Sequence, residues 1–207
     1  MTARVLVVGC GDLGLRTAHN LLARGARVWA LLRRPPAQDQ SQISWLQGDL
    51  SRPDTLNALP SYISHVVYCS APDTRTQAAY RSVFVDGVGH VLDALDARHL
   101  QRLVFISSSA VYGGHGGAWI DEDTTLNPLG FNGTILLEAE SLLAQRNFST
   151  VSLRLAGIYG PGHLQLIDRL RAGQAHTPYE PAHWANRIHI DDAAAVVEHL
   201  LFLPHAQ

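Results

Sequence analysis

The sequence predicts an α/β fold in which a doubly wound parallel sheet is covered by helices on both faces. Short runs rich in valine, leucine and isoleucine alternate with longer segments of helical periodicity, which is typical of such a sheet. The first apolar run is followed by a glycine-rich turn and then directly by a helical pattern. The chain has 207 residues, of which 46% are apolar, and this is enough for one domain with a sizeable core.

Six strands are expected from the apolar and β-branched runs. Glycines follow the first run, the segment Arg33-Arg34-Pro35-Pro36 stops the second, and the third run is weaker. For six strands in this type of sheet we expect the order 3-2-1-4-5-6. The expected strands cover residues 4–8, 28–32, 44–47, 65–69, 103–106 and 151–155.

The helices are expected from apolar periodicity and from capping residues. Gly25 is a favourable C-cap for the first helix, and Asp191 or Asp192 is a good N-cap for the last. The second helix has apolar residues at the i, i+3, i+4, i+7 spacing of one helix face. The expected helices cover residues 15–23, the region around 88–95, residues 135–145, and the segment from 191 or 192 to 203.

Two long segments, residues 113–133 and 157–187, interrupt this alternation. The first is rich in glycine and also contains aspartate, threonine and proline, and the second holds three prolines and several histidines around one short helix. Long irregular segments in a compact domain are usually functional, and both follow strands of the expected sheet. We therefore expect residues 1–207 to form a single dinucleotide-binding domain of Rossmann type, with 157–187 as a reduced substrate-lobe insertion.

Composition excludes several classes of function. The 16 basic residues are all arginine and are balanced by 18 acidic ones, so no electrostatic footprint for nucleic acid or an anionic membrane is present. The absence of lysine excludes a Walker-type phosphate lysine, a Schiff-base lysine and a lysine-assisted tyrosine base. No apolar run approaches a membrane span, and no signal peptide is visible. Cys10 and Cys69 are expected to be reduced structural thiols, so we expect a cytoplasmic protein.

The turn Gly9-Cys10-Gly11-Asp12-Leu13-Gly14 has the G-x-G-x-x-G spacing between a strand and a helix. In this context Gly9 allows a tight turn, Gly11 lets the backbone approach a diphosphate, and Gly14 allows close helix–strand packing. Backbone N–H groups at the helix start, including those of Asp12 and Leu13, would face the anion. The alternative is that the glycines serve packing alone. The context favours a nicotinamide dinucleotide site.

Arg33 and Arg34 follow the second strand, where a carboxylate would bind the adenine ribose of NAD. Guanidinium groups suit a 2′-phosphate through charge-assisted, bidentate contacts. The pair therefore favours NADP over NAD. The alternative is an exposed arginine pair at a strand end.

Five further motifs follow the glycine turn: Gly48-Asp49-Leu50, Ser70-Ala71-Pro72, Ser107-Ser108-Ser109-Ala110-Val111-Tyr112-Gly113, the segment from Arg154 to Gly162, and the segment from Arg187 to Ala193. They occur in the order found in the extended short-chain dehydrogenase/reductases, and the chain resembles the NAD-dependent epimerase/dehydratase group of that superfamily. The resemblance implies that Asp49 and Leu50 meet the adenine, and that Ser70, Ala71 and Pro72 line the cofactor. It also places Ser107 and Gly157 at the cofactor.

The chain departs from this family at the Tyr-x-x-x-Lys pair that supplies the proton. Alignment on Gly133 puts Asn132 and Leu136 at the two positions, and a shift by one residue gives Phe131 and Ile135. Neither register contains a proton donor, so the chain resembles the atypical branch of the superfamily. Typical members also continue beyond the last helix, so the lobe is small or the sequence is shortened.

Ser108 stands at the position of the family's catalytic serine or threonine, and its alternative role is that of a polar strand-end residue. Weaker acid–base candidates are Tyr112, Tyr159 and Glu122. The spacing of His183, His189 and Asp191 does not support a metal site, and we expect His189 to be structural.

Two functions remain open. One is an NADP-dependent oxidoreductase or epimerase-like enzyme acting on a carbonyl or nucleotide-sugar-like small molecule. The other is a catalytically silent NADP-binding redox sensor or protein-interaction module. Family members often dimerise through the helices after the fourth and fifth strands, so the resemblance leads us to expect a homodimer. The second of these helices is apolar enough for such a contact at Ile135, Leu136, Leu137, Leu142 and Leu143.

Overall fold

The central element of the fold is a six-stranded parallel sheet in the order β3-β2-β1-β4-β5-β6, which confirms the predicted order. The computed structural model describes residues 2–38, 40–176 and 184–204. The strands are β1 (Arg4–Val8), β2 (Arg27–Leu32), β3 (Ser44–Gln47), β4 (His65–Tyr68), β5 (Arg102–Ser108) and β6 (Ser149–Leu155).

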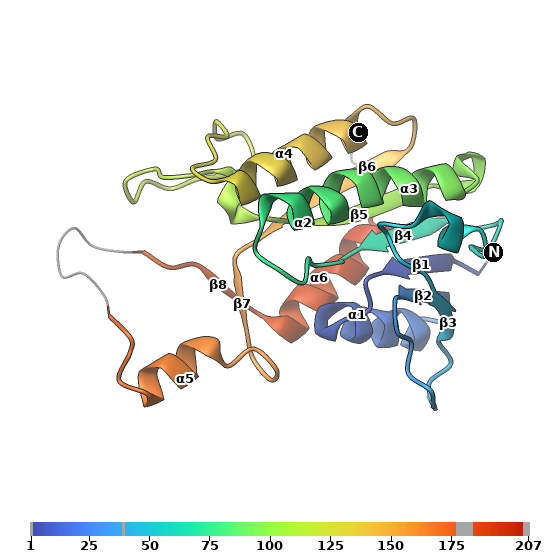
Figure 1. The fold of residues 1–207 in the computed structure, drawn as a ribbon, viewed down its shortest axis with the longest axis horizontal. Helices are drawn as coiled ribbons and strands as arrows, with labels where there is room; N and C mark the ends of the chain where they lie inside the picture. The colour runs from blue at the N-terminus through green and yellow to red at the C-terminus, as the bar shows by residue number, and fades with distance from the viewer. Residues whose placement is uncertain (1, 39, 177–183, 205–207) are drawn as a thin grey trace.

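Helices cover both faces of this sheet, so the doubly wound α/β fold is also confirmed. Figure 1 shows α1 and α6 on one face and α2, α3 and α4 on the other. Their bounds are α1 (Asp12–Ala23), α2 (Gln77–Arg81), α3 (Gly87–Ala94), α4 (Phe131–Ala144) and α6 (Ile190–Phe202).

The core consists of two apolar layers, one on each side of the sheet. Successive side chains of a strand point to opposite faces. In β1, Leu6 and Val8 therefore join the layer under α3 and α4, whereas Val5 and Val7 join the layer under α1 and α6. All four side chains are fully buried. This explains why β1 reads as a continuous apolar run.

The helix after β4 begins earlier than the sequence indicates and contains a π-helical turn at Ser82–Asp86. The N–H of Gly87 bonds to the carbonyl of Ser82, five residues back. The buried Tyr68 hydroxyl donates to the carbonyl of Val83 at 2.6 Å. A Cβ on Gly87 would lie 2.9 Å from that hydroxyl, so this position favours glycine. Such π-turns are frequent at functional sites.

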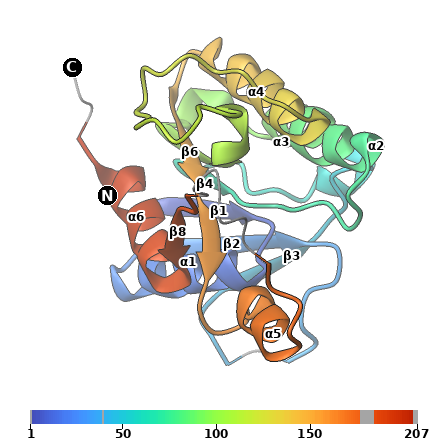
Figure 2. The same cartoon turned by 90° about the vertical axis from the view of Figure 1, so that its left-hand side faces the viewer.

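The segment after β6 contains two strands that the sequence did not predict. Strands β7 (Gly157–Tyr159) and β8 (Arg187–His189) pair in parallel and form a separate two-stranded sheet. Each has only three residues, too few for a recognisable apolar pattern. Between them lies α5 (Gln165–Arg171), which stands apart from the other helices beyond the carboxyl edge of the main sheet (Figures 1 and 2). His183 lies outside the described residues.

The last helix, α6, begins at Ile190, before the Asp191 or Asp192 that the sequence indicated as its N-cap. Its N-cap is His189, whose Nδ1 accepts from the N–H of Asp191 at 3.3 Å. Asp191 and Asp192 lie in the first turn, where their negative charges interact favourably with the positive end of the helix dipole. The prediction of an aspartate N-cap was therefore wrong, and the structural role expected for His189 is that of the cap itself.

Candidate functional site

The glycine turn joins the end of β1 to the start of α1, and its three glycines have different surroundings. Gly9 has a φ of +85°, and a Cβ there would collide with the backbone of Ser70. A Cβ on Gly14 would lie 2.6 Å from the carbonyl oxygen of Gly9. At Gly11, by contrast, a Cβ would have no atom of the described residues within 4 Å apart from those of Gly11 and its two chain neighbours. Gly9 and Gly14 are thus needed for packing, whereas Gly11 leaves its backbone open to a ligand.

Two cavities adjoin this turn at the carboxyl edge of the sheet. The first, of about 480 Å³, extends past the ends of β2 and β3 to the π-turn. The second, of about 350 Å³, extends past the end of β5 to the start of α4. The residues lining both cavities are Gly11, Cys69, Ser70, Ala71 and Pro72. The two cavities therefore form one elongated site that is centred on the glycine turn.

The first cavity is lined by charged side chains that are held by hydrogen bonds to neighbouring residues. Arg33 forms two hydrogen bonds to Asp73, with Nη1–Oδ2 and Nη2–Oδ1 distances of 2.6 and 2.5 Å. This contact raises the pKa of Arg33 and lowers the pKa of Asp73. Asp49 accepts from the N–H and the hydroxyl of Ser51, and these bonds lower the pKa of Asp49. Leu50 lines the same cavity, whereas Arg34 is exposed and does not.

The second cavity contains Ser108 and both residues that alignment places at the Tyr and Lys positions. Asn132 and Leu136 line it, together with Ser107 and Ser108. In the other register, Ile135 is buried in the core and Phe131 packs edge-on against Tyr80. The geometry therefore favours the register with Asn132 and Leu136. The Ser108 hydroxyl oxygen accepts from the N–H of Ala110 at 3.2 Å, so its hydrogen can point to a ligand.

The structure adds His163 to this cavity, a residue that the sequence reasoning missed. His163 lines the second cavity, and its Nε2 lies 3.3 Å from Oδ2 of Asp12. Asp12 also pairs with Arg16 at 3.0 Å. The signal in the sequence is the Gly160-Pro161-Gly162 segment, which forms a tight turn after β7. Both glycines have positive φ values, and a Cβ on Gly162 would approach Asp12 to 2.5 Å.

Ser107 and Tyr112 belong to a largely buried polar network behind the cavity. The Ser107 hydroxyl donates to Oε1 of Glu140 at 2.5 Å, and Arg154 donates from Nη2 to Oε2 of Glu140 at 2.8 Å. The Tyr112 hydroxyl accepts from Nη1 of Arg154 at 3.1 Å. The contact with Glu140 raises the pKa of Arg154. This network ties β5, α4 and β6 together.

Three other predicted site residues line neither cavity. Gly157 packs on Arg187, where a Cβ would collide with the guanidinium. Tyr159 is half exposed and contacts the ring of His189, and Glu122 is exposed on the loop after β5. Among the described residues, no His, Cys, Asp and Glu side chains form a group of three that could hold a metal ion.

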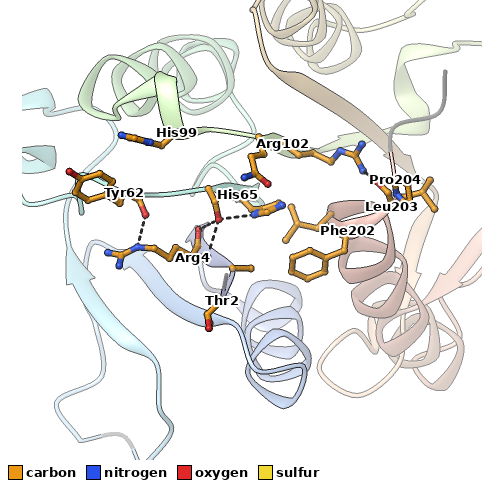
Figure 3. Close-up of a pocket in the computed structure, with 13 residues that line it drawn as sticks. Thr2, Arg4, Tyr62, His65, His99, Arg102, Phe202, Leu203 and Pro204 are labelled. Carbon is orange, nitrogen blue, oxygen red and sulfur yellow. Dashed lines mark hydrogen bonds between the residues drawn. The ribbon is translucent and has the colours of Figure 1, made fainter.

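A third cavity, of about 510 Å³, lies at the amino edge of the sheet, and Figure 3 shows the residues that line it. Two of its arginine side chains bond to backbone carbonyls of the protein. Arg4 donates from Nε to the carbonyl of Tyr62 at 2.6 Å, and Arg102 donates from Nη1 to the carbonyls of Leu200, at 2.8 Å, and Leu203. Ligands of open parallel sheets bind at the carboxyl edge, so the site beside the glycine turn is the stronger candidate.

Across the described ranges, no helix combines the length and the apolar character needed to cross a bilayer.

Comparisons with known proteins relate the whole chain to one family. Residues 5–205 match the NAD-dependent epimerase/dehydratase family. Protein YeeZ of Escherichia coli K12 is 30% identical over 210 residues, which cover 97% of this chain and 74% of YeeZ.

Two solved structures are also similar. One is a protein of Methylobacillus flagellatus assigned to the NAD-dependent epimerases/dehydratases, with a TM-score of 0.79 and 37% identity over 99% of this chain and 74% of that chain. The other is MoeE5 in complex with UDP-glucose and NAD, with a TM-score of 0.80 and 26% identity over 97% of this chain and 72% of that chain. Because the family match spans nearly the entire sequence, the chain belongs to the NAD-dependent epimerase/dehydratase family.

Proposed function

We propose that the protein binds a nicotinamide dinucleotide across the first and second cavities. The observation that carries this proposal is the open backbone of Gly11, which lies between the two cavities at the start of α1. A diphosphate there would receive N–H groups from the helix N-terminus, and no side chain at that position would exclude it. The residues present therefore fit the cofactor. MoeE5, whose structure contains NAD, supports the same proposal.

In this arrangement the first cavity takes the adenosine half and the second takes the nicotinamide half. Asp49 and Leu50 face the adenosine, and Gly9, Gly11, Asp12, Leu13 and Gly14 form the diphosphate turn. Ser70, Ala71 and Pro72 line both halves, while Ser107 and Ser108 lie at the nicotinamide end. Gly157 would act only indirectly, through the position of β7.

We further propose a preference for NADP. Arg33 lines the adenosine cavity, and its guanidinium has the fork geometry that binds a phosphate in bidentate fashion. Arg34 is the next residue and would add positive charge from the surface rather than a contact inside the cavity.

The reaction that fits the second cavity is oxidation or reduction of a small molecule with a carbonyl or hydroxyl group, in the manner of an oxidoreductase or epimerase. A bound nicotinamide supplies or accepts the hydride at the reacting carbon. The Ser108 hydroxyl would donate a hydrogen bond to the substrate oxygen. In reduction the imidazolium form of His163 would deliver a proton to that oxygen and become neutral imidazole, which would take the proton back in oxidation, with Asp12 orienting the ring. These two groups would replace the missing Tyr–Lys pair.

Residues 157–187 are proposed to serve as a reduced substrate lobe within a single domain. This segment contains β7, α5 and the first residue of β8, and α5 lies beyond the carboxyl edge of the main sheet (Figure 2). His163, between β7 and α5, lines the second cavity. A nucleotide-sugar-like substrate is one candidate for this position.

The test begins with titration of NADH and NADPH, followed by a screen of cofactor oxidation against carbonyl compounds and nucleotide sugars. We expect binding of both nucleotides and turnover with at least one carbonyl. Ser108→Ala and His163→Gln should lower kcat by about a hundredfold or more while leaving nucleotide affinity unchanged. Absence of binding would overturn the whole proposal, and unchanged kcat in both variants would overturn the assigned roles.

A second function is favoured by one specific observation. Asn132 and Leu136 line the cavity where the family has tyrosine and lysine, and neither side chain can exchange a proton near neutral pH. A catalytically silent NADP-binding sensor or interaction module would retain the cofactor site in this form. Tight NADPH binding without turnover on any substrate of the panel would favour this function.

A further inference from the structure

We propose that Asp73 is a specificity-determining residue, because its ion pair with Arg33 competes with the 2′-phosphate of NADP for the same guanidinium. This inference rests on the proposed function and concerns the adenosine end of the same site. It predicts that Asp73 limits the preference for NADP that Arg33 alone would give.

The ion pair lies in the first cavity, where the proposed function places the adenosine half of the dinucleotide. Arg33 directly follows β2, and Asp73 lies in the loop after β4. These two strands flank β1 in the sheet, so the pair spans the carboxyl end of β1, where the glycine turn begins. Both residues line the first cavity together with Asp49.

The geometry leaves the guanidinium committed to a carboxylate. The two Nη atoms of Arg33 donate to the two oxygens of Asp73 at 2.6 and 2.5 Å, which is the bidentate arrangement that a phosphate would also require. A 2′-phosphate must therefore displace Asp73 or share the fork with it. Asp49 is bonded to Ser51 and adds a second negative charge to the cavity wall.

The pair is solvent-exposed, and this determines the size of the effect. The side chains of Arg33 and Asp73 are 54% and 64% exposed. Exposed ion pairs contribute little to stability, so exchange of Asp73 for a phosphate is feasible and the selectivity change should be modest. Asp73 would reduce 2′-phosphate binding by competition and repulsion, while the ribose hydroxyls of NAD would leave the pair intact.

The test uses two fragments that differ only in the 2′-phosphate, 5′-AMP and adenosine 2′,5′-bisphosphate, titrated calorimetrically against the full chain. Asp73→Asn keeps the size of the side chain and removes its charge. We expect this variant to bind the bisphosphate about five times more tightly and 5′-AMP within about twofold of the wild type. The gain should shrink at high salt, because it is electrostatic. NADPH and NADH should show the same difference.

Two variants serve as matched controls. Asp73→Glu retains the charge and should keep the ratio of the two affinities close to that of the wild type. Asp54→Asn removes an equally exposed aspartate, paired with Arg52 at 3.0 Å outside the cavity, and should change neither affinity.

The possible outcomes separate this inference from the proposed function. A bisphosphate affinity that stays unchanged or falls in Asp73→Asn would overturn the inference, since Asp73 would then merely hold Arg33 in place. An equal gain for both fragments would also overturn it, because the pair would then only obstruct the cavity. If the wild type binds neither fragment and neither dinucleotide, the proposed function fails and this inference fails with it.

Discussion

The glycine turn assigns different tasks to neighbouring residues of the same type. Gly9 and Gly14 cannot carry a side chain without moving Ser70 or the turn itself, whereas Gly11 has open space beside it. Substitution at Gly11 therefore separates ligand binding from folding.

We predict that Gly11→Ala leaves the free energy of unfolding within about 0.5 kcal/mol of the wild type and lowers NADH affinity at least about tenfold. The added methyl group would occupy the space through which the diphosphate approaches the backbone. Chemical denaturation and fluorescence titration measure the two effects. Gly89→Ala in α3 is the control, since its Cβ also meets open space but lies outside both cavities. Wild-type affinity in Gly11→Ala would place the diphosphate elsewhere.

His65 provides a prediction about pH at the opposite edge of the sheet. It is buried at the start of β4, with its ring centroid 5.1 Å from that of Phe202. Burial lowers the pKa of His65, and the charge of Arg102 lowers it further. The unfolded chain, with an ordinary histidine pKa near 6.5, therefore binds more protons at acidic pH, so the free energy of unfolding must fall as the pH drops below about 6.5.

We expect His65 to account for a loss of about 1 kcal/mol between pH 7.5 and 5.5, measured by urea denaturation at both values. His65→Gln should show a correspondingly smaller loss over the same interval, whatever its stability at pH 7.5. His19→Gln, which changes an exposed histidine of α1, should behave as the wild type. An identical pH dependence in His65→Gln would contradict the prediction.

Among the secondary-structure elements, β5, α4 and β6 are joined by one carboxylate. Glu140 is buried in α4, accepts from Ser107 of β5, and pairs with Arg154 of β6. Removal of the charge would leave the Arg154 guanidinium, 19% exposed, without its counter-ion. The cost of breaking such a buried pair exceeds the value of the pair itself.

We predict that Glu140→Gln lowers the free energy of unfolding by about 3 kcal/mol. The control is Glu138→Gln, two residues away on the same helix, where an exposed carboxylate pairs with Arg81 at 2.7 Å. That change should have little effect, because solvent screens the pair. Denaturation of both variants at one pH makes the comparison, and equal losses would show that burial of the Glu140 pair is not decisive.

For the whole molecule, the proposed single domain and the proposed cofactor lead to one thermal prediction. We expect one unfolding transition, whose midpoint rises by about 5–10 °C at a NADPH concentration of 100 times Kd. Binding to the folded state alone produces this shift, and Gly11→Ala should show a much smaller one at the same concentration. Two transitions would instead indicate that residues 157–187 unfold separately.

The surface of α4 bears on the proposed homodimer. Ile135, Leu136 and Leu143 are buried in the core, and Leu137 and Leu142 are partly buried against it. The apolar run of this helix therefore serves the core of one copy first. A homodimer stays a prediction, and a contact through α4 would use a mixed surface on which Phe131 is exposed beside polar residues such as Glu138 and Ser141.

Much of the fold could be predicted from the sequence because its determinants are local. The strands β1, β2, β4 and β5 are built on apolar runs, and the glycine spacing between β1 and α1 identifies the turn without reference to distant residues. Absence of lysine is likewise a property of the sequence alone. The short strands β7 and β8 and the π-turn lacked such signals, since three-residue strands and a local change of helical pitch leave no periodicity.

Only the tertiary structure showed which side chains meet. The bonding of Arg33 to Asp73, the placement of His163 beside Asp12, and the choice of Asn132 and Leu136 over Phe131 and Ile135 all depend on contacts between segments far apart in the chain. Periodicity along a strand or helix specifies which face is buried, but it contains no distance between the loops at the ends of different strands. Those distances follow from the order and register of the sheet, and they determine the chemistry of the site.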